Sequence, residues 1–245
     1  MRNFKLTIEY DGTGYRGWQR QAQGPTIQGE IEKALRTMTR APVALIGSGR
    51  TDAGVHALGQ VANFRCGTRL SAEIFQRGLN SLLPPDIVIR RCEAVDGQFH
   101  ARFDAQNKTY RYRILNHATP AAIGRQYAWH VRQTLDREGM SRAATYLQGT
   151  HDFSAFEASG SPRAHSVRCV LRAKVTTVEP GDLVVEIQAD GFLRCMVRNI
   201  VGTLVTVGLG RMSPEAVRRV LASRDRSQAG ATAPPQGLFL VRVQY

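Results

Sequence analysis

The sequence predicts an α+β protein. Three observations predict this class: polar and apolar residues alternate in several short stretches, apolar residues recur at helical spacing in others, and the two kinds of stretch are interspersed along 245 residues. Sequential strands with helices between them are typical of helices that cover one side of a largely antiparallel sheet. A chain of this length can form one large globular unit or two compact halves.

The first half combines strands with two helices. Phe4, Leu6, Ile8 and Tyr10 alternate with polar residues, which indicates a half-buried strand. Capping residues and prolines mark the helix ends. The predicted elements are a strand at 4–10, a helix capped by Thr26 and reaching about residue 38, a short buried strand at 43–46, a helix from Ser71 that ends before Pro84-Pro85, and a strand at 87–95.

The second half repeats this pattern. Tyr110 and Tyr112 alternate with Arg111 and Arg113, which predicts a strand with an aromatic face and a cationic face. We expect the division between the halves near Asp104, giving an N-terminal half of residues 1–104 and a C-terminal half of residues 105–245. The other predicted elements are a helix at about 136–147, strands at 167–178 and 183–189, a helix from about Phe192, a helix starting at Ser213-Pro214, and a final strand at 238–245.

The charge balance indicates a polyanionic partner. The chain has 33 Lys and Arg against 20 Asp and Glu, a net charge of +13, and only four of the cationic residues are lysine. Guanidinium groups bind phosphates in a bidentate manner and stack on bases, whereas ammonium groups do not. RNA or DNA is therefore favoured over a membrane. A genome that prefers arginine codons would produce the same bias, so this alternative stays open.

Cysteine spacing and hydropathy predict a cytoplasmic location. Cys66, Cys92, Cys169 and Cys195 are widely spaced and form no Cys-x-x-Cys pair, so neither a disulfide framework nor a structural zinc site is expected. The N-terminal residues do not resemble a signal peptide. The most apolar stretch, at 200–209, is much shorter than the roughly 20 residues that a membrane span needs.

The glycine-rich stretch at 47–56 carries the candidate catalytic group. It has neither the Gly-Lys-Ser/Thr ending of a phosphate loop nor the third glycine of a dinucleotide-binding loop. It does place Asp52 in a turn between two predicted strands, two residues from Arg50. Such a carboxylate, kept ionised by positive charge and backbone N–H groups, can act as a nucleophile. An aspartate with a purely structural role, whose side chain only forms a hydrogen bond to the backbone of its own turn, would have the same local sequence.

Several motifs in the same order resemble the tRNA pseudouridine synthase A (TruA) family. The first is Gly-Arg-Thr-Asp-Ala-Gly-Val-His at 49–56, which resembles the active-site signature of that family. Together the motifs span nearly the whole chain. The others are Glu-Tyr-Asp-Gly-Thr at 9–13, Gly-Trp-Gln-Arg-Gln at 17–21, Leu79-Asn80 with Leu83-Pro84, Phe-His-Ala-Arg at 99–102, Lys-Thr-Tyr-Arg-Tyr at 108–112, Gly-Phe-Leu at 191–193, Met-Val-Arg-Asn-Ile-Val-Gly-Thr at 196–203, and Ala-Pro-Pro-Gln-Gly-Leu at 233–238.

The resemblance implies an enzyme that isomerises uridine to pseudouridine at positions 38–40 of the tRNA anticodon stem-loop. It implies a pseudouridine synthase fold: two related α/β halves around a largely antiparallel sheet, with a central active-site cleft between them. It also implies that no metal, nucleotide or redox cofactor takes part, and that the protein works as a homodimer with tRNA as its partner and no membrane contact.

The resemblance also implies roles for five residues. Asp52 matches the nucleophile and Arg198 the arginine that pairs with it. Tyr110 matches a tyrosine that stacks on the target uracil, and Leu238 an apolar residue that packs against the base. Arg50 matches an arginine that helps to hold the RNA open. A helix-surface arginine and a core leucine are the plain structural alternatives for Arg198 and Leu238.

The remaining basic and histidine residues are assigned less specific roles. Structural roles are expected for His56, His100 and His151, because none has metal-ligand spacing or a reactive neighbour. A basic RNA-binding protein that has lost catalysis remains an alternative function. Other arginines are expected to line a groove for the tRNA backbone, among them Arg16, Arg20, Arg102, Arg111 and Arg113.

Overall fold

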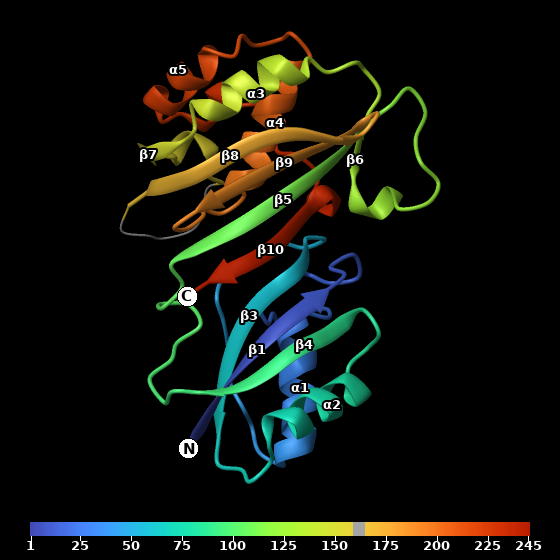
Figure 1. Ribbon diagram of the computed structural model, residues 1–245, viewed down its shortest axis with the longest axis vertical. Coiled ribbons are helices and arrows are strands. Elements are labelled where there is room, and N and C mark those ends of the chain that lie inside the picture. The colour runs from blue at the N-terminus through green and yellow to red at the C-terminus, as the bar shows by residue number, and fades with distance from the viewer. Residues whose placement is uncertain (159–164) are drawn as a thin grey trace. The chain divides into compact units, whose positions relative to one another are not determined.

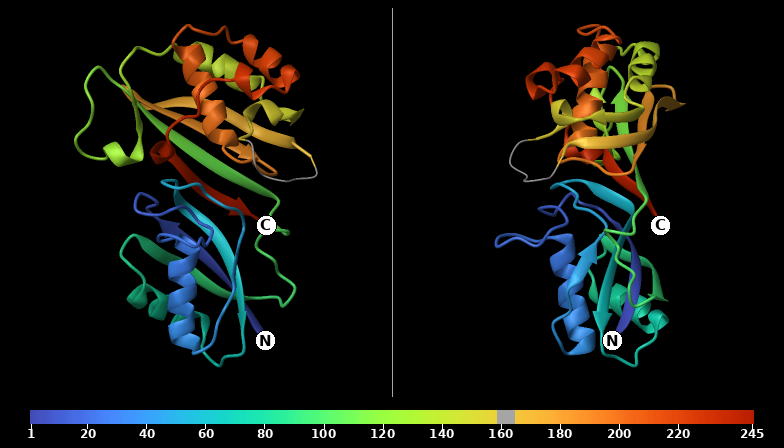
Figure 2. Two further views of the ribbon diagram at one scale, coloured as in Figure 1. Left: turned by 180° about the vertical axis from the view of Figure 1, so that it is seen from behind. Right: turned by 90° about the vertical axis from the view of Figure 1, so that its left-hand side faces the viewer.

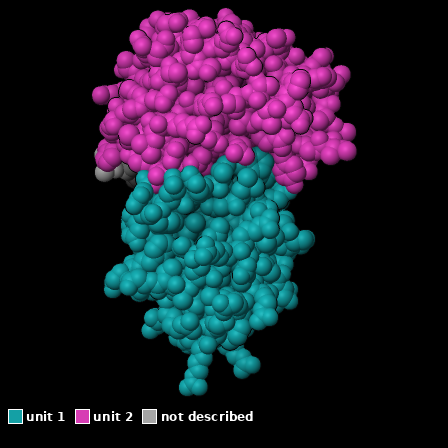
Figure 3. Space-filling model, viewed as in Figure 1, with its two compact units in different colours: residues 1–106, 239–245 teal, residues 107–238 magenta. Residues whose placement is uncertain are grey.

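The computed structural model describes residues 1–158 and 165–245, which form two compact units. The first unit contains Met1–Gln106 together with Phe239–Tyr245, and the second contains Asn107–Leu238 (Figure 3). The expected division near residue 104 assigned all of residues 105–245 to the second half. The last strand instead belongs to the first unit, because it pairs in parallel with a strand there, Phe239 opposite His56 and Leu240 opposite Ala57.

The first unit contains a largely antiparallel sheet and two helices. Strand order is β4-β1-β3-β10, β2 also pairs with β3, and the β10–β3 pair is parallel. Figure 2 shows α1 along one face of this sheet. Its elements are β1 (Arg2–Tyr10), α1 (Ile27–Thr39), β2 (Leu45–Gly47), β3 (His56–Cys66), α2 (Ala72–Leu82), β4 (Ile87–Val95) and β10 (Leu238–Gln244).

The alternation predicted for residues 4–10 builds the core of the first unit. Phe4 on β1 stacks on Phe64 of β3 with ring centroids 5.3 Å apart, and Phe75 of α2 contacts both rings. The predicted caps are present, since the hydroxyl groups of Thr26 and Ser71 each accept a backbone hydrogen bond at the start of their helices. Local sequence therefore sets both the strand face and the helix starts.

The second unit contains the remaining strands, with helices on one side. Strand order is β5-β9-β8-β7, and β6 pairs in parallel with β5. In Figure 1, α3, α4 and α5 lie over one side of these strands. The elements are β5 (Asn107–Asn116), β6 (Trp129–Val131), α3 (Arg137–Thr145), β7 (Gly149–Asp152), β8 (Val167–Glu179), β9 (Asp182–Ala189), α4 (Met196–Gly208) and α5 (Ala216–Ser223).

Strand β5 has the two faces that its sequence predicts. Tyr110, Tyr112 and Ile114 are buried. On the other face, Arg111 and Arg113 each lie 3.3 Å from a carboxylate oxygen of β9, on Glu186 and Asp182 respectively. These half-exposed pairs contribute little to stability, but they offset part of the positive charge on this face.

Two helices begin later than expected. Cys195 has a left-handed backbone (φ 59°), so α4 starts at Met196 and not near Phe192. A tight turn precedes α5, because the Ser213 carbonyl accepts from the N–H of Ala216 three residues on. Over the described ranges, the α+β class is confirmed, with ten strands and five α-helices. In those ranges every helix is too short or too polar to cross a bilayer.

Candidate active site

Asp52 lies in the loop that joins β2 to β3, and the backbone of this loop is held by the segment after β1. The N–H of Trp18 donates to the carbonyl of Thr51 at 3.1 Å, and the N–H of Val55 closes the turn on the carbonyl of Asp52 at 3.2 Å. Gly17 has a φ of +89°, and a Cβ there would lie 2.5 Å from the Thr51 oxygen. Only glycine permits this approach.

Hydrogen bonds from buried side chains hold the same loop. The hydroxyl of Tyr10 lies 2.8 Å from that of Thr51, and burial raises the pKa of Tyr10, so the phenol stays neutral and keeps this hydrogen bond. Gln60 accepts from the Ser48 hydroxyl at 2.7 Å and donates to the Gly49 carbonyl at 3.0 Å. The loop is therefore fixed before and after Asp52, whose side chain stays partly exposed.

We expect Tyr10→Phe to lower the free energy of unfolding by about 1–3 kcal/mol, because it leaves the buried Thr51 hydroxyl without this partner. Tyr146→Phe is the matched control, since the Tyr146 hydroxyl makes no hydrogen bond with any residue that the structure describes. It should change stability by less than about 0.5 kcal/mol. Urea unfolding measures both, and equal losses would contradict a stabilising Tyr10–Thr51 bond.

Two neighbours of Asp52 are also placed by the fold of the first unit. Arg50 is exposed, and its Nε donates to the side-chain oxygen of Gln19 at 3.0 Å. His56 is buried, accepts from the N–H of Gly12 at 3.0 Å and stacks on Phe239. His56 thus braces the loop that follows β1, in the structural role expected of it.

The second unit holds Tyr110 and Tyr112 on the buried face of β5. Tyr110 is 7% exposed, and its ring meets that of Phe192 edge-on with centroids 4.9 Å apart. Tyr112 is fully buried, and its hydroxyl donates to the carbonyl of Pro234 at 2.7 Å. Tyr112 is therefore a core aromatic residue, and Tyr110 is the one nearer the surface.

Arg198 lies on α4, where the segment at 233–237 fixes its orientation. Its Nε donates to the carbonyl of Ala233 at 2.8 Å, and the N–H of Ala233 donates back to the Arg198 carbonyl at 3.1 Å. A Cβ on Gly237 would lie 2.6 Å from the Tyr112 ring, so this segment packs directly on that ring before entering Leu238, which is 5% exposed. The second unit therefore brings Arg198 and the segment leading to Leu238 together around Tyr112.

Asn199 supports this arrangement, although no role is expected for it from the sequence. It is fully buried, and its Nδ2 donates to the Phe156 carbonyl at 2.7 Å. Its Oδ1 accepts from the Thr232 hydroxyl at 2.7 Å and from a guanidinium N–H of Arg226 at 3.1 Å. A single side-chain amide on a mostly apolar helix was the signal in the sequence, since buried polar groups need partners.

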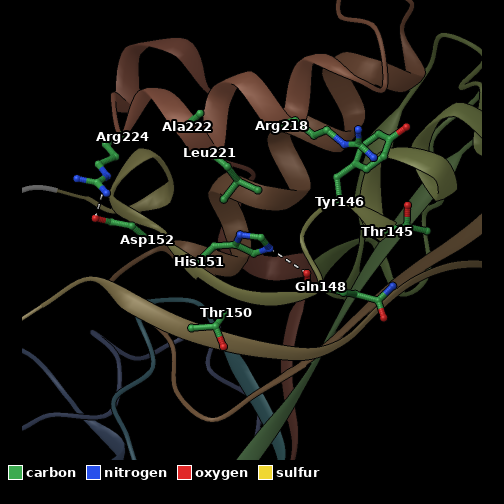
Figure 4. A pocket seen from close by; sticks show the side chains of 10 residues that line it. All are labelled: Thr145, Tyr146, Gln148, Thr150, His151, Asp152, Arg218, Leu221, Ala222 and Arg224. Carbon is green, nitrogen blue, oxygen red and sulfur yellow. Dashed lines mark hydrogen bonds and ion pairs between the residues drawn. The ribbon is translucent and has the colours of Figure 1, made fainter.

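A separate cavity of about 620 Å³ opens in the second unit between β7, α5 and the end of α3 (Figure 4). The guanidinium of Arg218 lies 4.1 Å from the centre of the Tyr146 ring, and Arg224 pairs with Asp152 at 3.2 Å. None of the five predicted site residues lines this cavity. Asp52 and Arg50 belong to the first unit, whereas Tyr110, Arg198 and Leu238 belong to the second.

Comparison with known proteins identifies the family. A profile described as tRNA pseudouridine synthase matches residues 6–104 and 143–245, which include Asp52, Arg50, Arg198 and Leu238, while Tyr110 falls between the two matched ranges. The chain therefore belongs to the tRNA pseudouridine synthase family, and the resemblance to its TruA members is confirmed. It is an isomerase that forms pseudouridine in tRNA.

Full-length relatives support the same assignment. The chain is 50% identical over 247 residues to tRNA pseudouridine synthase A of Acetivibrio thermocellus and 48% identical over 246 residues to that of a Thermoanaerobacter species, with 100% of both chains covered in each case. It is 49% identical to that of Moorella thermoacetica over 98% of each chain. A crystal structure of a Cbf5-Nop10-Gar1 complex matches with a TM-score of only 0.38 and 14% identity, covering 97% of this chain and 48% of that one, which is too weak to support an argument.

Proposed function

We propose that this enzyme modifies uridines 38–40 in the anticodon stem-loop of tRNA, with Asp52 as the nucleophile. The observation that carries the proposal is the Asp52 loop, which is fixed by backbone and buried side-chain hydrogen bonds while the carboxylate stays partly exposed. A reacting group must be held in position by residues that are themselves fixed, and this loop meets that requirement.

In the proposed reaction, the carboxylate of Asp52 attacks either C1′ of the ribose or C6 of the uracil. The N1–C1′ bond breaks, the uracil turns while bound, and C5 bonds to C1′. The bond from Asp52 to C1′ or C6 then breaks, which frees the carboxylate, while the C5 proton is lost and N1 is protonated. The product is an isomer of the substrate, so atoms and electrons balance. An attacking carboxylate must be ionised, which a closed pocket opposes. We assign to Arg198 the positive charge that offsets this cost.

Three further residues are proposed to hold the RNA. Tyr110 stacks on the uracil during its rotation, and such a stack contributes roughly 1–3 kcal/mol. Leu238 packs against the same base. Arg50, which is exposed beside Asp52, takes the space left by the extruded nucleotide, whose removal from the helix costs a few kcal/mol.

The position specificity is tested with tRNA transcripts that carry [5-³H]uridine at only one of positions 38, 39 or 40. The wild-type protein should release tritium from each, because loss of the C5 proton accompanies pseudouridine formation. A transcript with cytidine at all three positions and labelled uridine elsewhere is the matched control. Release from the control alone would show that the enzyme modifies another part of tRNA.

The alternative function, an RNA-binding protein without catalysis, predicts salt-dependent tRNA binding and no tritium release from any transcript. Membership of an isomerase family argues against it.

We also propose a cytoplasmic homodimer, since one subunit of a dimer could hold the body of a long tRNA while the other modifies its arm. Sedimentation at micromolar concentration checks the dimer, and a monomer mass would refute it.

A further inference from the structure

An exposed aromatic stack lies on the loop at 99–104, which includes the Phe-His-Ala-Arg motif at 99–102. Phe103 is 75% exposed, and it is the only exposed phenylalanine or tryptophan in the part of the chain that the structure describes. One side of its ring is stacked on His100, with centroids 4.2 Å apart and an angle of 27° between the planes. The guanidinium of Arg102 lies 5.7 Å from the Phe103 ring centre.

Buried amides hold this loop in place. Asn63 is fully buried, accepts from the N–H of Ala101 at 2.9 Å and donates to the Asn3 side chain at 3.0 Å. Asn3, also buried, donates to the carbonyl of Phe99 at 2.9 Å. The hydroxyl of Tyr245 donates to the carbonyl of Ala101 at 2.7 Å. The position of the loop is therefore set by partners from both ends of the first unit.

The stack itself is also fixed. The backbone N–H groups of Arg102 and Phe103 both donate to His100 Nδ1 at 3.2 Å, which orients the imidazole under the Phe103 ring. The N–H of His100 in turn donates to Asp104. Phe103 is thus supported on its inner side and is open to solvent on its outer side, an arrangement that loses little side-chain freedom when a ligand binds.

We infer that this loop is a base-stacking platform for a tRNA nucleotide other than the target uridine. Exposed aromatic rings next to cationic side chains bind unpaired bases and their phosphates. Arg102 makes no ion pair with any described residue, so its charge is available to a phosphate. The substrate of this family is tRNA and the chain carries a net charge of +13, which favours RNA over an apolar protein partner.

The inference is tested by measuring the dissociation constant for tRNA. Phe103→Ala should weaken binding roughly 10-fold, which lies within the range expected for one base–aromatic stack, whereas Phe103→Tyr should stay within about 2-fold of wild type. Ile123→Ala removes an apolar side chain that is 94% exposed in the second unit and should change nothing. The melting temperature should be the same for all three variants, because both side chains are exposed.

Arg102→Gln supplies an independent measurement. Removing one phosphate contact should reduce the slope of log Kd against log salt by about one. The platform is refuted if Phe103→Ala binds tRNA like Ile123→Ala, or if sedimentation shows that Phe103→Ala changes the oligomeric state, which would place the ring between two copies of the chain. Binding does not require the chemical step, so a failure here differs from a failure of the Asp52 mechanism.

Discussion

Asp52→Ala should abolish tritium release from [5-³H]uridine-labelled tRNA, with a loss of at least about 10⁴-fold in kcat, while the protein remains folded. The reason is that the proposed covalent step has no other carboxylate at this position, and removal of a nucleophile typically costs this much or more. Thr51, Gly49 and Ser48 anchor the loop that carries Asp52, so the substitution leaves their hydrogen bonds intact.

Two further variants sharpen this experiment. Asp52→Asn keeps the shape of the side chain and removes its charge, and it should be as inactive as Asp52→Ala if the carboxylate itself attacks. Glu73→Gln removes an exposed carboxylate from the first turn of α2 and should leave the rate unchanged. Circular dichroism and tRNA binding establish that each variant is folded. Normal tritium release from either Asp52 variant would exclude this residue from the mechanism.

Gly202→Ala should have the largest effect on stability. A Cβ at this position of α4 would lie 1.7 Å from the carbonyl oxygen of Ala231, and the contacting atom is backbone. Movement of the 229–233 segment away from this Cβ would break hydrogen bonds, because Arg198 bonds to Ala233 and Asn199 bonds to Thr232. We expect a loss of about 3 kcal/mol or more, at the upper end of overpacking effects, and a melting temperature lower by about 6–12 °C.

Gly78→Ala is the matched control for that substitution. Gly78 is also a helical glycine, but its added Cβ would meet only the flexible end of the Met38 side chain. The better helix propensity of alanine, about 1 kcal/mol, should offset the small rearrangement. Thermal unfolding compares the two variants. Similar melting temperatures for both would show that the close approach of α4 to the 229–233 segment is not rigid.

Local elements were predictable because their causes are close in sequence. Alternation placed Phe4, Leu6 and Ile8 on the buried face of β1, and the predicted strand at 87–95 coincides with β4. The caps at Thr26 and Ser71 were read correctly, since a cap joins residues three positions apart. The predicted start of α4 was wrong. Cys195 adopts a left-handed backbone conformation, which non-glycine residues rarely do, so the sequence did not indicate that the helix starts after it.

Contacts between distant residues could not be predicted in this way. Tyr10 meets Thr51 across 41 positions, and Asn3 meets the carbonyl of Phe99 across 96. The sequence motifs marked the segments that contain these residues. Nothing in the composition of these segments indicated which residues form hydrogen bonds with each other. The return of β10 to the first unit is of the same kind, since strand pairing depends on the whole sheet.

From the sequence by itself follow the α+β class, the membership of the tRNA pseudouridine synthase family and the candidate nucleophile, because periodicity and short motifs are local properties of the chain. Only the tertiary structure decided how the Asp52 loop is anchored, how Arg198 is oriented and why Phe103 remains at the surface. Each of these depends on buried hydrogen bonds between segments that are far apart in sequence, and such bonds exist only once the chain has folded around them.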